Sequence, residues 1–244
     1  MEIKTDVLVV GAGHAGCEAA LAAARMGCRV TILTASLQQV ARMPCNPSIG
    51  GPAKAHLVRE VDALGGIMGQ AIDETHIHIR MLNTSKGPAV QALRAQADRP
   101  RYSERVKLEV VSHPNIQIHQ DLIQELHFHQ GEILGATGAS GTKYRAGATV
   151  LTTGTFLGGL IHMGETSFAA GRSGEPPSQA LSDSLRACGL ELGRLKTGTT
   201  PRLHRDTINW KAMEEQTPTE TPLVFSRPLP PETPSQAPQL LFNP

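Results

Sequence analysis

The feature that most constrains the fold is a run of glycines between an apolar segment and an alanine-rich segment near the N-terminus. Residues 6–10 read DVLVV, the near-continuous apolar pattern of a strand buried on both faces of a parallel sheet. GAGHAG follows at residues 11–16, and residues 14–26 are rich in alanine, which lets a helix lie close against a sheet. Gly27 ends that helix, and residues 29–33 supply a second strand. The pattern predicts one βαβ unit of a dinucleotide-binding domain.

Each of the three glycines has its own physical role in such a unit. Gly11 permits the tight turn from strand to helix, Gly13 lets the backbone approach a pyrophosphate, and Gly16 lets the helix pack on the strand. The amides that begin the helix would then point at an anion. The usual acidic partner of the ribose is missing, because Thr34 and Ser36 stand at the end of the second strand. A hydroxyl or a backbone group would therefore have to hold the ribose.

Further patterns predict the helices of an α/β domain. Residues 42–52 contain three prolines and two glycines, so we expect a constrained loop without regular structure. Helical spacing returns over residues 53–64 and again over residues 101–111. In the first of these helices the spacing groups four apolar residues on one face: Ala53, Leu57, Val61 and Leu64.

The later strand patterns predict a small antiparallel meander inside the domain. A short strand is expected at residues 116–118, followed by a hairpin of residues 122–128 and 132–137 that turns at Gln130 and Gly131. Residues 148–152 read ATVLT and are expected to return as a buried strand. The fold class predicted is a Rossmann-like α/β domain with a parallel central sheet and an antiparallel β-meander.

Composition excludes several classes of protein. The 244 residues are 40% hydrophobic, enough for a sizeable core, and the formal charge of +1 gives no general attraction to nucleic acid or membrane. No stretch approaches the roughly 18 uninterrupted apolar residues of a membrane span, so a soluble cytoplasmic protein without membrane contact is expected. The four cysteines form no Cys-x-x-Cys pair and are expected to be reduced.

Seven ordered motifs resemble the MnmG family, also called GidA, of tRNA-modifying flavoproteins. The motifs are GAGHAG (11–16), PCNPSIGG (44–51), HLVREVDALGG (56–66), SKGPAVQALRAQADR (85–99), LTTGTFLGG (151–159), GEPPS (174–178) and GRLKTGT (193–199). They extend over almost all of residues 1 to about 205. The family also ends its second strand with threonine, which fits the missing acidic residue.

The resemblance implies an activity, with its cofactors and partners. Members of the family bind FAD and, with the GTPase MnmE, install a carboxymethylaminomethyl or aminomethyl group on carbon 5 of the wobble uridine of tRNA. Methylenetetrahydrofolate supplies the carbon, NADH reduces the flavin, and glycine or ammonium supplies the amine. A homodimer of the full-length chain joins MnmE in a heterotetramer.

The same resemblance implies the residues that bind the cofactor. The FAD pyrophosphate would lie on the glycine motif, Ile123 would contact the adenine end through its backbone, and Ser178 would touch the cofactor. The motif residues concerned are Gly11, Ala12, Gly13, His14, Ala15 and Gly16.

The resemblance also implies that the sequence stops inside a second domain. Members of the family are much longer, so we expect a FAD-binding domain at residues 1–200 and the incomplete start of an inserted domain at residues 201–244. Eight of the 17 prolines fall after residue 217, which suits neither helix nor central strand. The region is expected to be a linker or an incomplete piece of that domain.

Cys45 is the candidate catalytic residue. It lies in the proline-bracketed loop that would face the flavin, where a thiolate could add to carbon 6 of a uracil and activate carbon 5. The alternative is a small buried residue that shapes the loop. Cys17 and Cys28 flank the first helix and are expected to serve core packing.

The histidines suggest a cofactor contact but no metal site. His14 lies inside the glycine motif. Its ring would either sit over the cofactor or a bound anion, or contact residues that in turn contact the cofactor. His76 and His78, like His127 and His129, would share one side of a strand, but no third ligand accompanies either pair.

Basic residues gather in two stretches. Solvated helix faces and contact with tRNA phosphates are both open explanations. The first stretch holds Arg80, Lys86, Arg94, Arg99, Arg101, Arg105 and Lys107, and the second holds Arg186, Arg194, Lys196, Arg202 and Arg205.

Two other functions remain open from the sequence. A folate- and FAD-dependent tRNA uridine methyltransferase shares the glycine motif, although it is not expected to carry PCNPSIGG and SKGPAV together. A non-catalytic remnant that only binds nucleotide or partner chains is the second alternative.

Overall fold

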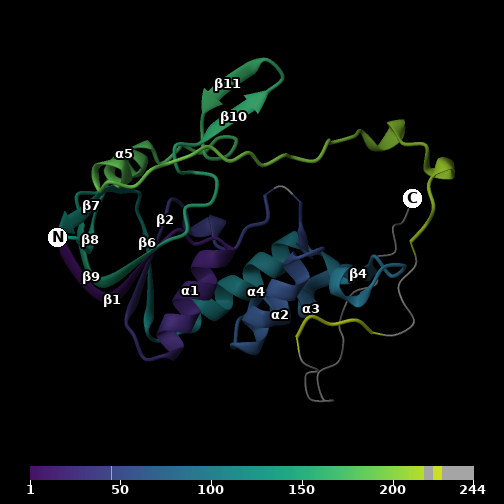
Figure 1. Ribbon diagram of the computed structural model, residues 1–244, viewed down its shortest axis with the longest axis horizontal. Helices are drawn as coiled ribbons and strands as arrows, with labels where there is room; N and C mark the ends of the chain where they lie inside the picture. Colours follow the sequence, from purple (N-terminus) through teal and green to yellow (C-terminus); the bar gives the residue numbers. More distant parts are fainter. Residues whose placement is uncertain (45, 217–221, 227–244) are drawn as a thin grey trace. The chain divides into compact units, whose positions relative to one another are not determined.

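The computed structural model describes residues 1–44, 46–216 and 222–226, and these form two compact units (Figure 1). Unit 1 comprises Met1–Arg42 and Val106–Arg194. Unit 2 comprises Met43–Arg105 and the described residues from Leu195 onward. Helix α4 (Arg99–Ser112) begins in unit 2 and ends in unit 1, which confirms the helix expected over residues 101–111.

Unit 1 is built on a six-stranded sheet in the order β6-β2-β1-β9-β8-β7. The pairs β6–β2, β2–β1 and β1–β9 are parallel, whereas β9–β8 and β8–β7 are antiparallel. This confirms the predicted Rossmann-like α/β fold with a parallel central sheet and an antiparallel meander. The strands are β1 (Glu2–Val10), β2 (Val30–Thr34), β6 (Ile116–Gln120), β7 (Ile123–His129), β8 (Glu132–Gly138) and β9 (Lys143–Leu151).

The first βαβ unit forms as predicted. Strand β1 is interior to the sheet, and its Leu8 and Val9 are fully buried. Helix α1 (His14–Arg25) packs against β1 and β2 through a buried side that is mostly small, since it includes Gly16 and Ala20. Small residues bring the helix axis close to the sheet, which fixes where its N-terminus meets the end of β1.

The meander turns where the sequence predicted. Gln130 (φ 49°) and Gly131 (φ 88°) both take positive φ, as a two-residue hairpin turn requires. Helix α5 (Gln179–Ala187) packs on β7, where the Ser184 hydroxyl accepts a hydrogen bond from the Leu126 amide at 2.8 Å. The core beneath consists of Leu8, Val10, Leu33, Ile123, Leu126, Ala136, Tyr144, Leu181 and Leu185.

Strand β9 is interior to the sheet but not buried as expected. It pairs with β1 along its length, yet Ala148 is exposed and Leu151 keeps 37% of its surface accessible. The apolar run correctly indicates an interior strand. Residues 148–151 pair with β1, and such pairing covers the backbone of a strand but not its side-chain faces, so the expectation of burial was wrong.

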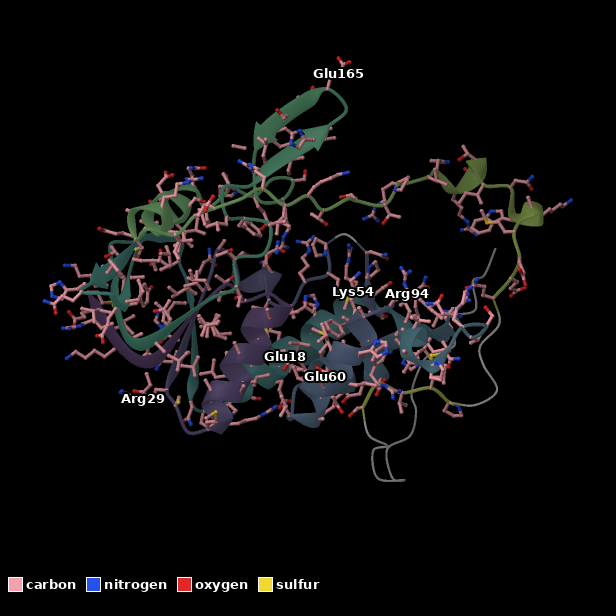
Figure 2. All side chains as sticks on the ribbon, viewed as in Figure 1. Glu18, Arg29, Lys54, Glu60, Arg94 and Glu165 are labelled. Atoms are coloured by element: carbon pink, nitrogen blue, oxygen red, sulfur yellow. The ribbon has the colours of Figure 1, made fainter. Side chains whose placement is uncertain are left out.

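A separate hairpin extends from unit 1. Strands β10 (Leu160–Met163) and β11 (Thr166–Ala169) pair antiparallel, and Glu165 lies at the tip of the hairpin (Figures 1 and 2). All of β11 is exposed. Neither strand was predicted from the sequence.

Unit 2 contains a three-stranded antiparallel sheet in the order β3-β5-β4. Its strands are β3 (Ser48–Gly50), β4 (His76–Leu82) and β5 (Ala92–Ala97). Strand β3 corrects the expectation that residues 42–52 have no regular structure. A strand of three residues fits between Pro47 and Pro52. Pro47 itself contributes only a carbonyl, which accepts from the Ala97 amide at 2.7 Å.

Two helices pack together in unit 2. They are α2 (Lys54–Ala63) and α3 (Met68–Thr75), and α2 confirms the helix expected over residues 53–64. The apolar face grouped by the spacing is exposed, with 59% of Leu57 and 90% of Leu64 accessible, whereas Ala55 and Val58 are buried. Small side chains thus face the packed side, because they allow α2 to approach β3 and β5 closely.

A segment from the C-terminal region completes unit 2. Phe225 is buried at 3% exposure, and its ring lies so close to Gly50 that a Cβ there would approach it to 2.7 Å. The Asp73 carboxylate accepts from the amides of Phe225 and Ser226, each at 2.8 Å, and Arg59 Nη2 donates to the Val224 carbonyl at 3.0 Å. We call residues 222–226 the docked segment. Most of the proline-rich tail lies outside the described residues.

The described residues contain no helix with the length and apolar character needed to cross a bilayer.

Candidate dinucleotide-binding site

The turn between β1 and α1 has no room for side chains at two of its glycines. Gly11 has φ +104°, and an added Cβ would overlap the carbonyl oxygen of Thr152. A Cβ on Gly16 would overlap the carbonyl oxygen of Gly11. The end of β1, the start of α1 and the residue after β9 therefore meet at backbone contact distance, as the sequence predicted for Gly11 and Gly16.

Gly13 differs, because open space surrounds the position that its Cβ would take. It is the N-cap of α1, with extended backbone (φ −75°, ψ −171°), and no side chain caps the helix. No acidic residue stands in the first turn either. The positive end of the helix dipole thus has neither a side-chain cap nor an acidic residue, which fits a pyrophosphate.

Hydrogen bonds from three sides hold the glycine turn. The Thr152 hydroxyl donates to the Val10 carbonyl at 2.9 Å and lies 3.1 Å from that of Gly11, and the Ala41 amide donates to the Ala12 carbonyl at 2.8 Å. Cys17 Sγ also donates to Ala12, at 3.5 Å. Burial raises the pKa of the Cys17 thiol to about 12, so it stays protonated and serves packing, as expected.

His14 interacts electrostatically with Arg172, a cation that no motif in the sequence marks. Burial, and secondarily the charge of Arg172, lowers the pKa of the His14 imidazole, which keeps the ring neutral. Arg172 Nη1 donates to Gln39 Oε1 at 3.1 Å, and its guanidinium lies 4.9 Å from the centre of the Phe156 ring. Glu175 is 3.9 Å away. Arg172 lies far from the glycines in sequence, so no local pattern could have identified it.

Ser178 is hydrogen-bonded to Phe156, the residue whose ring lies near the Arg172 guanidinium. Its amide donates to the Phe156 carbonyl at 2.8 Å, and its own carbonyl accepts from the Ser182 hydroxyl at 3.3 Å. Ser178 is the N-cap of α5, and its side chain makes no capping hydrogen bond. The backbone is thus fixed while the hydroxyl is left for another partner.

Ile123 begins β7 and is held by a buried carboxylate. Asp121 accepts hydrogen bonds from the Leu122 amide (2.9 Å), the Ser140 hydroxyl (2.6 Å) and the Tyr144 hydroxyl (3.0 Å). Burial disfavours the charged carboxylate, but these hydrogen bonds outweigh it and hold the pKa of Asp121 below its usual value. The carboxylate thus fixes the amide of Leu122, the residue before Ile123.

The end of β2 carries hydroxyls in place of a carboxylate. Thr34 Oγ1 donates to the Ser36 carbonyl at 3.1 Å, and Ser36 Oγ accepts from the Gln38 amide at 3.3 Å. The Thr34 carbonyl accepts from the Asp121 amide at 2.9 Å, which joins this edge to the loop before Ile123. Residues that follow the carboxyl ends of β1, β2, β6 and β9 therefore gather at one edge, where open α/β sheets bind ligands.

Cys45 lies outside the described residues. The basic residues of the first stretch are in unit 2, except Lys107.

Comparison with known proteins shows extensive similarity to one family. The family model described as glucose inhibited division protein A matches residues 6–242. The "tRNA uridine 5-carboxymethylaminomethyl modification enzyme MnmG" of Lactobacillus delbrueckii subsp. bulgaricus is 52% identical over 91% of this chain, and that of Bacillus subtilis (strain 168) is 51% identical over the same share. The matched part is 35% of each relative's length, so the chain spans about a third of those proteins.

Solved structures agree. GidA of Aquifex aeolicus matches with a TM-score of 0.87 and 46% identity, over 92% of this chain and 37% of that one. A GidA-related protein from Thermus thermophilus matches at 24% identity with a TM-score of 0.54, over 75% of this chain and 67% of that one, which shows the fold alone.

Proposed function

Because the chain belongs to the family of glucose inhibited division protein A, we propose that it binds FAD and forms the N-terminal part of a tRNA-modifying enzyme. The reaction is the addition of a carboxymethylaminomethyl or aminomethyl group to carbon 5 of the wobble uridine. The names of the relatives support the reaction. The observation that carries the cofactor assignment is the uncapped N-terminus of α1 at Gly13, which has open space in front of it.

The residues of the chain position FAD by backbone and charge. The amides of residues 13–16 hold the pyrophosphate, and the neutral His14 ring with the Arg172 guanidinium borders the same turn. Ile123 meets the adenine end through its backbone, and the Ser178 hydroxyl touches the cofactor. When bound, FAD supplies the redox chemistry, with NADH as its reductant.

The remaining participants follow from the family. Methylenetetrahydrofolate is the carbon donor, and tRNA is the substrate. The GTPase MnmE is the partner of a homodimer of the full-length chain, working in the cytoplasm. Residues 1–200 form the FAD-binding domain, and residues 201–244 begin an inserted domain.

Cys45 is the nucleophile in this proposal. Its thiolate adds to carbon 6 of the uracil, and the electron pair of the carbon 5–carbon 6 double bond moves toward carbon 5, which becomes nucleophilic. Once carbon 5 carries its new group and loses its proton, the thiolate leaves and the double bond returns.

The flavin spectrum of the purified 244-residue chain tests the cofactor assignment. We expect the absorbance bands of bound flavin to persist through gel filtration after FAD is added. A chain that is folded by circular dichroism but passes through the column without flavin would count against FAD binding and favour a non-catalytic remnant.

A further inference from the structure

A pair of arginines faces each other across the sheet of unit 2. Arg80 on β4 is directly opposite Arg94 on β5 in the antiparallel register. Directly opposite residues have Cβ atoms about 5 Å apart, so two like charges there destabilise a sheet. Both side chains are half-buried. Within residues 1–44, 46–216 and 222–226, neither guanidinium has a hydrogen-bond or ion-pair partner.

On the face that holds these arginines, the arginine row and one neighbouring row are polar, while the other neighbouring row consists of Leu82 and Ala92. The opposite face is apolar. Successive side chains of a strand point to opposite faces of the sheet. The buried Leu93 and Ala95 are therefore on the face opposite to Arg94. The register places His78 and Gln96 in the row next to the arginines, and Ser48 of β3 pairs with Gln96.

His78 adds an independent observation. Its Nε2 is buried, and in the part of the chain that the structure describes it has no hydrogen-bond partner. A buried ring nitrogen without a partner costs free energy unless a ligand satisfies it. It stands two residues before Arg80 on the same strand, and therefore on the same face.

The charges nearby do not explain the arginine pair. Each carboxylate of α3 is engaged elsewhere: Asp73 with the docked segment, and Glu74 with Arg105 at 2.7 Å. In the view of Figure 2, Arg94 and Lys54 lie toward the same side of unit 2, while Glu60 is at the other end of α2. The arginine face thus offers hydrogen-bond donors and positive charge.

We propose that Arg80 and Arg94, with His78 beside them, bind one phosphate group of the tRNA backbone. Two guanidinium forks on opposite strands suit an oxyanion that accepts from both, and the bound negative charge removes their mutual repulsion. This inference rests on the proposed function for the identity of the ligand. The assignment of an oxyanion site to the arginine face rests on the geometry alone and does not depend on the proposed function.

The first test is thermal stability in inorganic phosphate and in chloride at equal ionic strength. The double variant R80Q/R94Q is expected to unfold at the same or a higher temperature than wild type in chloride, because the like charges are gone. Phosphate is expected to raise the melting temperature of wild type but not of the variant. The control R99Q/R101Q removes two exposed charges from the start of α4 and should respond to phosphate as wild type does. Equal responses of all three proteins would overturn the oxyanion site.

The second test measures binding of an anticodon stem-loop RNA to the same proteins as a function of salt. R80Q/R94Q should weaken binding about tenfold or more and reduce the salt slope by about one contact, whereas R99Q/R101Q should have a smaller effect. R80K/R94K keeps both charges but loses the bidentate geometry, so it should weaken binding while its salt slope stays close to that of wild type. A response to inorganic phosphate without any change in RNA affinity would refute the RNA phosphate as the ligand.

The flavin absorbance of each sample separates this inference from the proposed function. A wild-type protein without bound flavin contradicts FAD binding. The phosphate and RNA comparisons between wild type and variants can still be interpreted in that case. Wild type with flavin but with equal RNA affinities among the variants contradicts the arginine site alone.

Discussion

At the scale of single residues, Gly13 and Gly16 have opposite demands although both belong to one motif. A carboxylate at Gly13 would enter the open space and the positive potential in front of α1, so Gly13→Asp should abolish flavin binding while the chain stays folded. Gly16→Ala has no space and should lower the stability of the fold by about 1 to 3 kcal/mol. Flavin content after gel filtration and the melting temperature measure the two effects.

Gly13→Ala is the matched control for Gly13→Asp, since its methyl group meets nothing in the structure. It should keep both the fold and a substantial part of the flavin affinity. Flavin retained by Gly13→Asp would remove the cofactor from this turn.

The Asp121 network predicts how stability depends on pH. Its folded pKa is held below the ordinary value, so its contribution is present above the unfolded pKa of about 4 and is lost as pH falls through the folded pKa. Asp121→Asn should cost about 1 to 3 kcal/mol at pH 7 and progressively less below pH 4. Urea unfolding at several pH values measures this difference.

Asp183→Asn is the control for Asp121→Asn, because Asp183 forms an exposed pair with Arg186 on α5. It should change stability little at any pH. A difference between wild type and Asp121→Asn that stays constant down to pH 3 would contradict the assigned role.

At the scale of elements, the sequence best predicts those helices, strands and turns whose formation depends on residues close together in the chain. The strand, glycine turn and helix of residues 6–33 carry their own signals, and so does the hairpin turn at Gln130 and Gly131. Helix α2 was predicted as a helix, but its buried side was not, because the small Ala55 and Val58 are buried while Leu57 and Leu64 are exposed. Strand β3 was missed because only pairing with β5 makes three residues a strand.

The docked segment gives a prediction about its own attachment. Asp73→Ala removes both acceptors of the Phe225 and Ser226 amides, so these amides should exchange with deuterium much faster, by about tenfold or more. The Leu126 amide, which donates to Ser184 in unit 1, should exchange at an unchanged rate. Hydrogen-exchange mass spectrometry measures both. Unchanged exchange at Phe225 and Ser226 would show that the Asp73 hydrogen bonds are not what holds the segment.

At the scale of the whole molecule, the candidate site was predictable only in part. The glycine motif, Ile123 and Ser178 were identified from sequence and resemblance, and the roles assigned to them stay predictions. The electrostatic effect of Arg172 on His14 joins residues far apart in the chain, and no spacing rule encodes it.

The proposed role of Cys45 is a property of the longer protein. In a chain that extends through the full family length, Cys45→Ser should lower the modification rate by several orders of magnitude while flavin affinity stays nearly intact. The half-buried Cys28 gives the control Cys28→Ser, which should leave the rate unchanged. The measured quantity is modified uridine per bound flavin. Equal values for wild type and Cys45→Ser would remove Cys45 from catalysis.

Unit 2 is assembled from two stretches of chain, and this affects the order in which the protein forms on the ribosome. Residues 43–105 emerge first, but the place beside Gly50 is filled only when Phe225 follows ~120 residues later. At roughly 5 to 20 residues per second, synthesis leaves that apolar place uncovered for about 6 to 24 seconds. The nascent chain is expected to be most exposed to chaperones and proteases in this interval, and Asp73 and Arg59 would end it by capturing the docked segment.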